Sequence, residues 1–172
     1  MRFAYPCSIV FDEGGSVEIG GGESVTFTEG CSVTFPDVYG ANTGGDSWEE
    51  ALEMAEDCLA TALGMYVKAG EDLPMPSRPS EGQILVPVPL LVAVKLALYT
   101  AMREQAISKD ALATRLGISV GTAQKLVNPS YRSHISQLEK ALRIVGRSLI
   151  VEDCDAVSAT RQEDALIVHI NP

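Results

Sequence analysis

The stretch Ser108–Val127, SKDALATRLGISVGTAQKLV, decides the fold of the second half of the chain, because it predicts two short helices joined by a tight turn. Ser108 and Ser119 can each accept a hydrogen bond from a free backbone N–H, so we expect them to begin the two helices. Gly117 lies between them, and a residue without Cβ adopts the left-handed conformation that reverses the chain at little cost. The residues expected to face inward are Leu112, Ala113, Leu116, Ile118, Ala123 and Leu126.

The two predicted helices have the spacing of a helix-turn-helix, in which a turn of about three or four residues joins helices that cross steeply. The pattern L-A-x-x-L-G-I-S-x-x-T-A-x-x-L, from Leu112 to Leu126, resembles the Cro/phage-repressor (XRE-like) helix-turn-helix family. The resemblance implies a DNA-binding domain. Further helices are expected at 90–105, packed through Leu91, Val94, Leu98 and Met102, and at 135–145, with short strands at 149–151 and 165–170.

The outward side of the second predicted helix carries polar side chains suited to DNA. Gln124 has the amide that can pair with adenine through two hydrogen bonds, and Lys125 can reach guanine or a phosphate. Ser119 and Thr122, at the helix start, favour phosphate contact. The loop that follows adds candidates for contacts with the DNA backbone, namely Tyr131, Arg132 and Ser133.

Val120 and Gly121 lack polar side chains, so one copy of this helix is expected to read few bases. Two copies about 34 Å apart would read an inverted repeat. We therefore expect a homodimer or tetramer on operator DNA, joined through the predicted strand at 149–151.

Length and composition describe a chain able to bury a core. The chain has 172 residues, 46% of them hydrophobic, and a mean hydropathy of +0.12, which fits one or two domains. No run of eighteen apolar residues occurs, and the start MRFAYPCSIV lacks the pattern of a signal peptide. We expect a cytoplasmic protein without a membrane span.

Cysteine spacing gives no sign of a metal site. The four cysteines, Cys7, Cys31, Cys58 and Cys154, show no C-x-x-C or Cys/His ligand spacing, which favours reduced thiols. The sequence therefore predicts neither a metal nor another cofactor.

Charge is distributed unevenly along the chain, whose net charge is −10. Residues 1–81 hold fifteen acidic and three basic side chains, whereas residues 92–149 hold nine basic and three acidic ones. The segment from 152 onward returns to an acidic excess of five against one. A nucleic-acid-binding surface needs positive charge only where it faces phosphates, so the basic middle fits DNA and the acidic front fits another partner.

The front of the chain predicts strands followed by one long helix. Residues 3–11 have the β-branched and aromatic content of a strand, with Pro6 indicating an edge or bulge. The two SVTF segments, at 24–27 and 32–35, are expected to be neighbouring strands of an antiparallel meander. Residues 35–46 then read as a loop.

Ser47 and Glu50 form a capping box that should begin the long helix, and Gly70 should end it. Its expected apolar stripe, which needs a sheet to cover, comprises Ala51, Leu52, Ala55, Leu59, Leu63 and Tyr66. A proline-rich loop leads to a last strand at 83–88, and Pro87 and Pro89 mark the domain boundary.

A second resemblance connects the two halves. The segment F-P-D-x-x-G-x-x-T-x-G-D-S-W-E-E-A, on Phe35–Ala51, with the following helix and the run Leu73–Ser77, resembles the HicB antitoxin family. It implies an α+β fold, a partial RNase H-like β-β-β-α-β domain followed by the helix-turn-helix domain. The expected boundaries are 1–88, 89–151 and an extension at 152–172. The sequence departs from the family by an insertion around Gly14 to Gly30 and by that extension.

The resemblance implies an antitoxin that neutralises a small basic HicA-like mRNA-cleaving toxin and represses its own operon, and that is not an enzyme. An acidic front domain would attract such a toxin, and aromatic residues would supply contact area. The candidate toxin-binding residues are Asp37, Tyr39, Trp48 and Glu49.

Two other functions stay open from the residues. An active RNase H-like nuclease would need clustered carboxylates to hold metal ions, for which Asp12, Glu13 and Asp37 are the candidates. The two histidines, His134 and His169, do not add support for catalysis, because neither has a cysteine or serine at a catalytic spacing. A ligand-sensing transcriptional regulator is the other alternative, although Gly20-Gly21-Gly22 lacks the helix and Lys-Thr pair of a phosphate loop.

Overall fold

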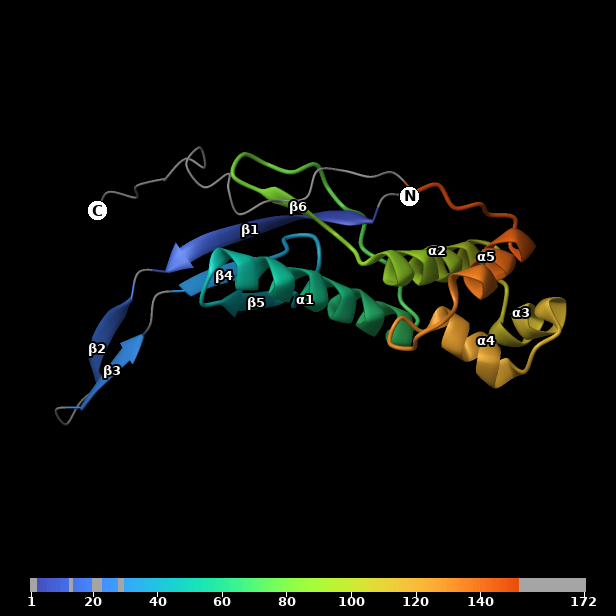
Figure 1. Cartoon of the computed structure of the whole chain (residues 1–172), viewed down its shortest axis with the longest axis horizontal. Coiled ribbons are helices and arrows are strands. Elements are labelled where there is room, and N and C mark those ends of the chain that lie inside the picture. The colour runs from blue at the N-terminus through green and yellow to red at the C-terminus, as the bar shows by residue number, and fades with distance from the viewer. Residues whose placement is uncertain (1–2, 13, 20–22, 28–29, 152–172) are drawn as a thin grey trace.

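A computed structural model describes residues 3–12, 14–19, 23–27 and 30–151. It is an α+β structure in which a sheet and one long helix precede four shorter helices (Figure 1). The strands are β1 (Ala4–Asp12), β2 (Gly15–Ile19), β3 (Glu23–Phe27), β4 (Gly30–Thr34), β5 (Asn42–Gly45) and β6 (Ile84–Pro87). The helices are α1 (Trp48–Ala69), α2 (Leu90–Glu104), α3 (Lys109–Leu116), α4 (Val120–Val127) and α5 (Ile135–Ile144).

Four strands form one sheet in the order β5-β4-β1-β6, and every neighbouring pair is antiparallel. Without β2 and β3, the order along the chain is β-β-β-α-β, as the family resemblance implies. Strand β1 pairs with β6 through Ala4–Cys7 and with β4 through Ser8–Asp12. Pro6 therefore lies in the half of β1 that has a ladder partner on one side only, where a missing N–H is tolerated.

Strands β2 and β3 form a separate two-stranded hairpin between β1 and β4, with Gly15 opposite Phe27 and Ile19 opposite Glu23. Figure 1 shows it extending from the end of the sheet. The hairpin occupies the position of the insertion expected around Gly14 to Gly30. The predicted pairing of the two SVTF segments is wrong, because the first pairs with β2 and the second with β1.

Helix α1 covers one face of the sheet, and its ends are those predicted. Ser47 Oγ accepts a hydrogen bond from Glu50 N at 3.2 Å, and Glu50 Oε2 accepts one from Asp46 N at 2.9 Å. Gly70 ends the helix in the left-handed conformation, with φ 75°. The fully buried residues of the helix are Ala51, Ala55, Leu59, Leu63 and Val67, while Leu52 and Tyr66 are partly buried.

Strand β5 corrects the prediction of a loop over 35–46. Its sequence, NTGG, has low strand propensity, yet it pairs with β4 from Asn42 to Gly45. A Cβ on Gly45 would lie 2.6 Å from Ala51 N, and one on Gly44 would lie 2.7 Å from Cys31 O. These glycines let the strand pass close to its neighbours, so tertiary contact overrides propensity.

Helices α2–α5 gather beyond the end of the sheet (Figure 1). The residues predicted to face inward from α2, α3, α4 and the turn between α3 and α4 are buried or half-buried, with Leu91 as the exception at 41% exposure. Lys95, which was not expected inside, is also buried. One continuous hydrophobic core runs from the sheet through α2 into this cluster.

The chain from Leu149 to Val151 forms no strand, which corrects that prediction. Ile150 and Val151 are exposed, and no strand of the described sheet lies in register with them. Three β-branched or aliphatic residues do not form a strand without a partner. The strand predicted at 165–170 and the extension 152–172 lie outside the described residues.

Candidate functional site

The α3–turn–α4 unit is built by three local devices that the sequence predicts. Ser108 Oγ accepts from Ala111 N at 3.1 Å and Ser119 Oγ accepts from Thr122 N at 3.2 Å, so a serine begins each helix. Gly117 has φ 66° and ends α3. The hydroxyls of Ser119 and Thr122 also share a hydrogen bond of 2.9 Å. The unit therefore has a fixed turn and a satisfied start to its second helix.

Helix α4 has an inner and an outer side. Its inner residues are Ala123, Leu126 and Val127. Its outer side carries the exposed Gln124 and Lys125, and the open space around Gly121. Of the residues predicted to face DNA, Ser119, Gln124 and Lys125 are exposed and Thr122 is half-buried.

The loop after α4 continues the same surface. Asn128 Oδ1 accepts from Ser130 N at 3.0 Å, which shapes the loop. Lys125 Nζ lies 5.9 Å from the centre of the Tyr131 ring, within range of a cation–π interaction. Arg132 is exposed and Ser133 is half-buried. We call the set formed by Ser119, Thr122, Gln124, Lys125, Tyr131, Arg132 and Ser133 the α4 surface.

The four predicted toxin-binding residues are not brought together. Tyr39 is 94% exposed in the turn between β4 and β5. Trp48 lies at the opposite end of α1, half-buried, and its ring stacks on Phe11 with centroids 5.9 Å apart. Glu49 is exposed beside it, and Asp37 Oδ2 accepts a hydrogen bond from Ser77 N at 2.7 Å. Asp37 therefore holds the proline-rich loop, whereas Tyr39 and Glu49 are exposed near opposite ends of α1.

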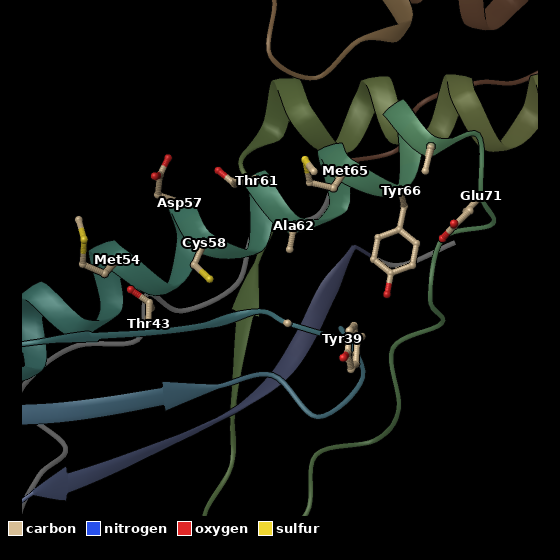
Figure 2. A pocket seen from close by; sticks show the side chains of 12 residues that line it. Tyr39, Thr43, Met54, Asp57, Cys58, Thr61, Ala62, Met65, Tyr66 and Glu71 are labelled. Atoms are coloured by element: carbon tan, nitrogen blue, oxygen red, sulfur yellow. The ribbon is translucent and has the colours of Figure 1, made fainter.

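A shallow groove of about 580 Å³ runs along α1 beside β5 and Tyr39. Figure 2 shows Cys58, Ala62 and Tyr66 on the side of α1 that faces Thr43 and Tyr39. Asp57 and Glu71 add negative charge to the lining. We call this the α1 groove; its other lining residues are Gly40, Met54, Thr61, Met65 and Ala69.

The α1 groove was missed in the sequence, although a signal for it exists. Met54, Cys58, Ala62 and Tyr66 recur every four residues, which places them in one row beside the core stripe. Met54 in this row is exposed, and so is the neighbouring Met65, which also lines the groove. Exposed apolar residues gathered in one patch favour a binding surface.

The thiol of Cys58 is not arranged as a nucleophile. Burial and then the negative charge of Asp57 raise its pKa above the usual value, which favours the protonated form. Its Sγ donates to Asn42 O at 3.6 Å. Cys58 therefore contributes packing to the groove.

Of the three carboxylates that a nuclease would need, only the side chain of Asp37 lies among the residues that the structure describes. Asp37 is engaged with the proline-rich loop, and Glu13 and the side chain of Asp12 lie outside the described residues. Over residues 3–151 as far as they are described, no three His, Cys, Asp or Glu side chains are grouped to hold a metal ion. His134 precedes α5 without capping it through its side chain, and His169 is outside the described range.

The described helices include none with the length and apolar content needed to cross a membrane.

The fold and these two surfaces define a class of protein: an α+β layer with strand order β5-β4-β1-β6 and a groove along α1, joined to a helical cluster in which a tight turn connects two serine-capped helices. Residues 24–97 match the family model described as a HicB-like antitoxin of a bacterial toxin-antitoxin system.

Relatives agree with that match. The chain is 38% identical over 120 residues to Antitoxin HicB 2 of Photorhabdus laumondii subsp. laumondii, covering 70% of this chain and 85% of that protein. It is 32% identical over 120 residues to Antitoxin HicB of Escherichia coli (strain K12), covering 70% and 87%. It is 33% identical over 117 residues to Antitoxin HicB of Pseudomonas fluorescens, covering 67% and 78%. The chain belongs to the HicB antitoxin family, whose members have a toxin as partner.

Proposed function

We propose that this antitoxin neutralises a small basic HicA-like mRNA-cleaving toxin through the α1 groove, and that it represses its own operon through the α4 surface. The observation that carries the first part is the groove itself, an exposed apolar row with acidic residues at its edge on the acidic part of the chain. The second part is supported by the outward polar side chains of α4 on the basic part of the chain.

The α1 groove suits a cationic protein for two reasons. Its apolar row offers contact area from aromatic and methionine side chains, which commonly dominate binding energy at interfaces. Its acidic edge and the excess of fifteen acidic over three basic residues in 1–81 would steer a basic partner and raise the association rate. Relative to the sequence hypothesis, Tyr39 stays a toxin-binding candidate, and Met54, Met65 and Tyr66 join it.

Co-expression with a small basic protein, if one is encoded next to its gene, followed by co-purification, tests the toxin part. We expect Met65→Lys to weaken the complex at least tenfold, because it places a buried positive charge opposite a basic partner. Met75→Lys is the matched control, since Met75 is also an exposed methionine, at 68% against 59%, but lies outside the groove. Equal retention of the partner by both variants would place toxin binding elsewhere.

Recognition of an inverted repeat in operator DNA requires two copies of α4. The repressor is therefore proposed to be a homodimer or tetramer. Titration of a duplex from the region upstream of its gene, against a scrambled duplex, tests this part. Preferential binding of the upstream duplex with a steep salt dependence is expected, because phosphate contacts release counterions. Equal binding of the two duplexes would remove the autorepressor role and leave the toxin role standing.

A ligand-sensing regulator is the second candidate, and one observation favours it. An open hollow of about 560 Å³ lies between α2, α3 and α4, lined by Tyr99, Met102, Ile107, Lys109 and Gln124 among others. A small molecule bound there would contact a proposed base-reading residue. Stabilisation of the protein in a thermal-shift screen of metabolites, together with altered DNA binding, would support sensing over toxin neutralisation.

A further inference from the structure

Helix α2 carries one charged side chain into the interior. Lys95 is 1% exposed, between the buried Val94 and Leu96, and is the only charged residue that the described part of the chain buries. An ammonium in an apolar interior is costly unless its donors are satisfied. Here its three N–H groups have three acceptors, the backbone carbonyl oxygens of Lys125 at 2.9 Å, Asn128 at 2.8 Å, and Tyr131.

The sequence explains why the carbonyl of Lys125 needs a donor from outside α4, whereas the carbonyl of Asn128 also accepts from Tyr131 N at 3.2 Å. In a continuing helix, the carbonyl of Lys125 would accept from the N–H of residue 129. That residue is Pro129, which has no N–H, and Asn128 has already left the helix with φ −78° and ψ 118°. The ammonium of Lys95 supplies the missing donor. It also lies at the carbonyl end of α4, where the helix dipole favours a cation.

The backbone that Lys95 holds from inside carries the α4 surface on its outside. Lys125 and Tyr131, two of the three residues it contacts, point their side chains to solvent and lie against one another. Arg132 and Ser133 follow directly. A displaced loop would therefore move Tyr131, Arg132 and Ser133, three of the seven residues of the α4 surface, at once.

We propose that Lys95 is a positioning residue for DNA binding: its buried ammonium fixes the end of α4 and the loop 128–131 so that Lys125, Tyr131 and Arg132 meet a phosphate backbone together. The proposal rests on the proposed DNA-binding function and adds a residue that never touches DNA. A positioning role and a packing role predict different effects of substitution on stability and on DNA affinity. Replacement of a buried charge by an apolar residue of similar volume is often neutral or stabilising, so stability and affinity need not fall together.

The test compares Lys95→Met with Leu98→Met in the full chain. Lys95→Met keeps the length of the side chain and removes all three donors, whereas Leu98→Met perturbs the same buried side of α2 and leaves the carbonyl contacts intact. Affinity for the upstream duplex is measured by fluorescence anisotropy at several salt concentrations. Lys95→Met is expected to bind about tenfold more weakly, with a salt slope shallower by about one phosphate contact or more. Leu98→Met should keep the slope of the wild type.

Amide hydrogen exchange of the free protein gives a second readout. Exchange at residues 130–133 should accelerate in Lys95→Met and stay unchanged in Leu98→Met. If Lys95→Met does not fold, Lys95→Gln replaces it, because an amide offers at most two donors and should give a smaller loss in the same direction.

The possible outcomes separate the two proposals. A folded Lys95 variant with wild-type affinity and salt slope overturns the positioning role while the DNA-binding function stands. A wild-type chain that does not prefer the upstream duplex overturns the DNA-binding function, and the positioning role with it. A loss of affinity with an unchanged salt slope and unchanged exchange assigns Lys95 to packing alone.

Discussion

The sheet with α1 and the cluster α2–α5 differ in charge and in the kind of surface they present, yet they are joined mechanically. Residues 1–81 are strongly acidic and offer an apolar groove, whereas residues 92–149 are basic and offer a polar helix face. Such opposite fields suit two different partners. One short chain therefore keeps two electrostatic characters apart in space while sharing one hydrophobic core.

The mechanical connection lies between the end of α1 and helix α2. Tyr99 Oη donates to Glu71 O at 2.7 Å, and Arg103 pairs with Asp72 at 2.7 Å while also donating to Gly70 O. The Arg103 guanidinium lies 5.7 Å from the centre of the Tyr99 ring. Since α2 also carries Lys95, the same helix contacts the end of the groove helix and the end of α4.

Removal of residues 90–172 is the largest change that tests the comparison. We expect operator binding to be lost completely, because α3 and α4 are gone, and toxin co-purification to persist. The remaining layer should unfold at a lower temperature than the full chain, since the contacts of Tyr99 and Arg103 with the end of α1 are lost. Anisotropy with the upstream duplex, co-purification and thermal unfolding followed by circular dichroism measure the three effects. A folded layer that no longer retains the toxin would show that the groove needs the cluster.

Lys125→Glu should separate the two surfaces by charge alone. We expect it to abolish operator binding, since reversal of a phosphate-facing charge adds repulsion to a lost contact, while toxin neutralisation continues. Lys68→Glu makes the same change of charge on the exposed side of α1 and should leave operator binding nearly intact. The measurements are anisotropy with the upstream duplex and growth rescue on co-expression. Loss of both activities in a folded Lys125→Glu protein would contradict separate surfaces.

The helix ends could be predicted because their causes are local. Ser47, Ser108 and Ser119 bond backbone groups three residues away, and Gly70 and Gly117 need only a left-handed conformation. Such patterns are legible in sequence without knowledge of the rest of the fold. The order of elements followed from the family resemblance, and the strand ladders agree with it.

The features that sequence reasoning missed depend on residues far apart in the chain. Strand β5 forms where glycines allow close approach to α1 and β4, which no local propensity shows. Lys95 is buried because Pro129, thirty-four positions later, leaves a carbonyl without a donor. The separation of Tyr39 from Trp48 depends on the direction of α1 across the sheet. In each case the partner could be known only from the fold.

Two glycine substitutions, one in the sheet and one in α4, should change the free energy of unfolding in opposite directions. Gly45→Ala should destabilise the protein by about 1–3 kcal/mol, because its Cβ would lie 2.6 Å from the backbone of Ala51. Gly121→Ala should stabilise it by up to about 1 kcal/mol, since the site is an open position inside α4 and alanine favours helix. Chemical denaturation measures both. Equal effects of the same sign would contradict the close approach of β5 to α1.

The pH dependence of Lys95 gives a change of slope that is confined to alkaline pH. Burial lowers the pKa of Lys95 from 10.5 to about 8, so between these values the unfolded chain keeps a proton that the folded protein has released. Unfolding then takes up a proton, and the unfolding free energy of the wild type rises with pH relative to Lys95→Met. Below about pH 7 both states hold the proton, and the difference between the two proteins should be constant. Urea denaturation at pH 7, 8, 9 and 10 measures it, with the variant as the reference that cancels the titration of all other groups. A difference that stays flat from pH 7 to 10 would mean that the three carbonyls hold the ammonium charged throughout, which would strengthen the link between the cluster's interior and its α4 surface.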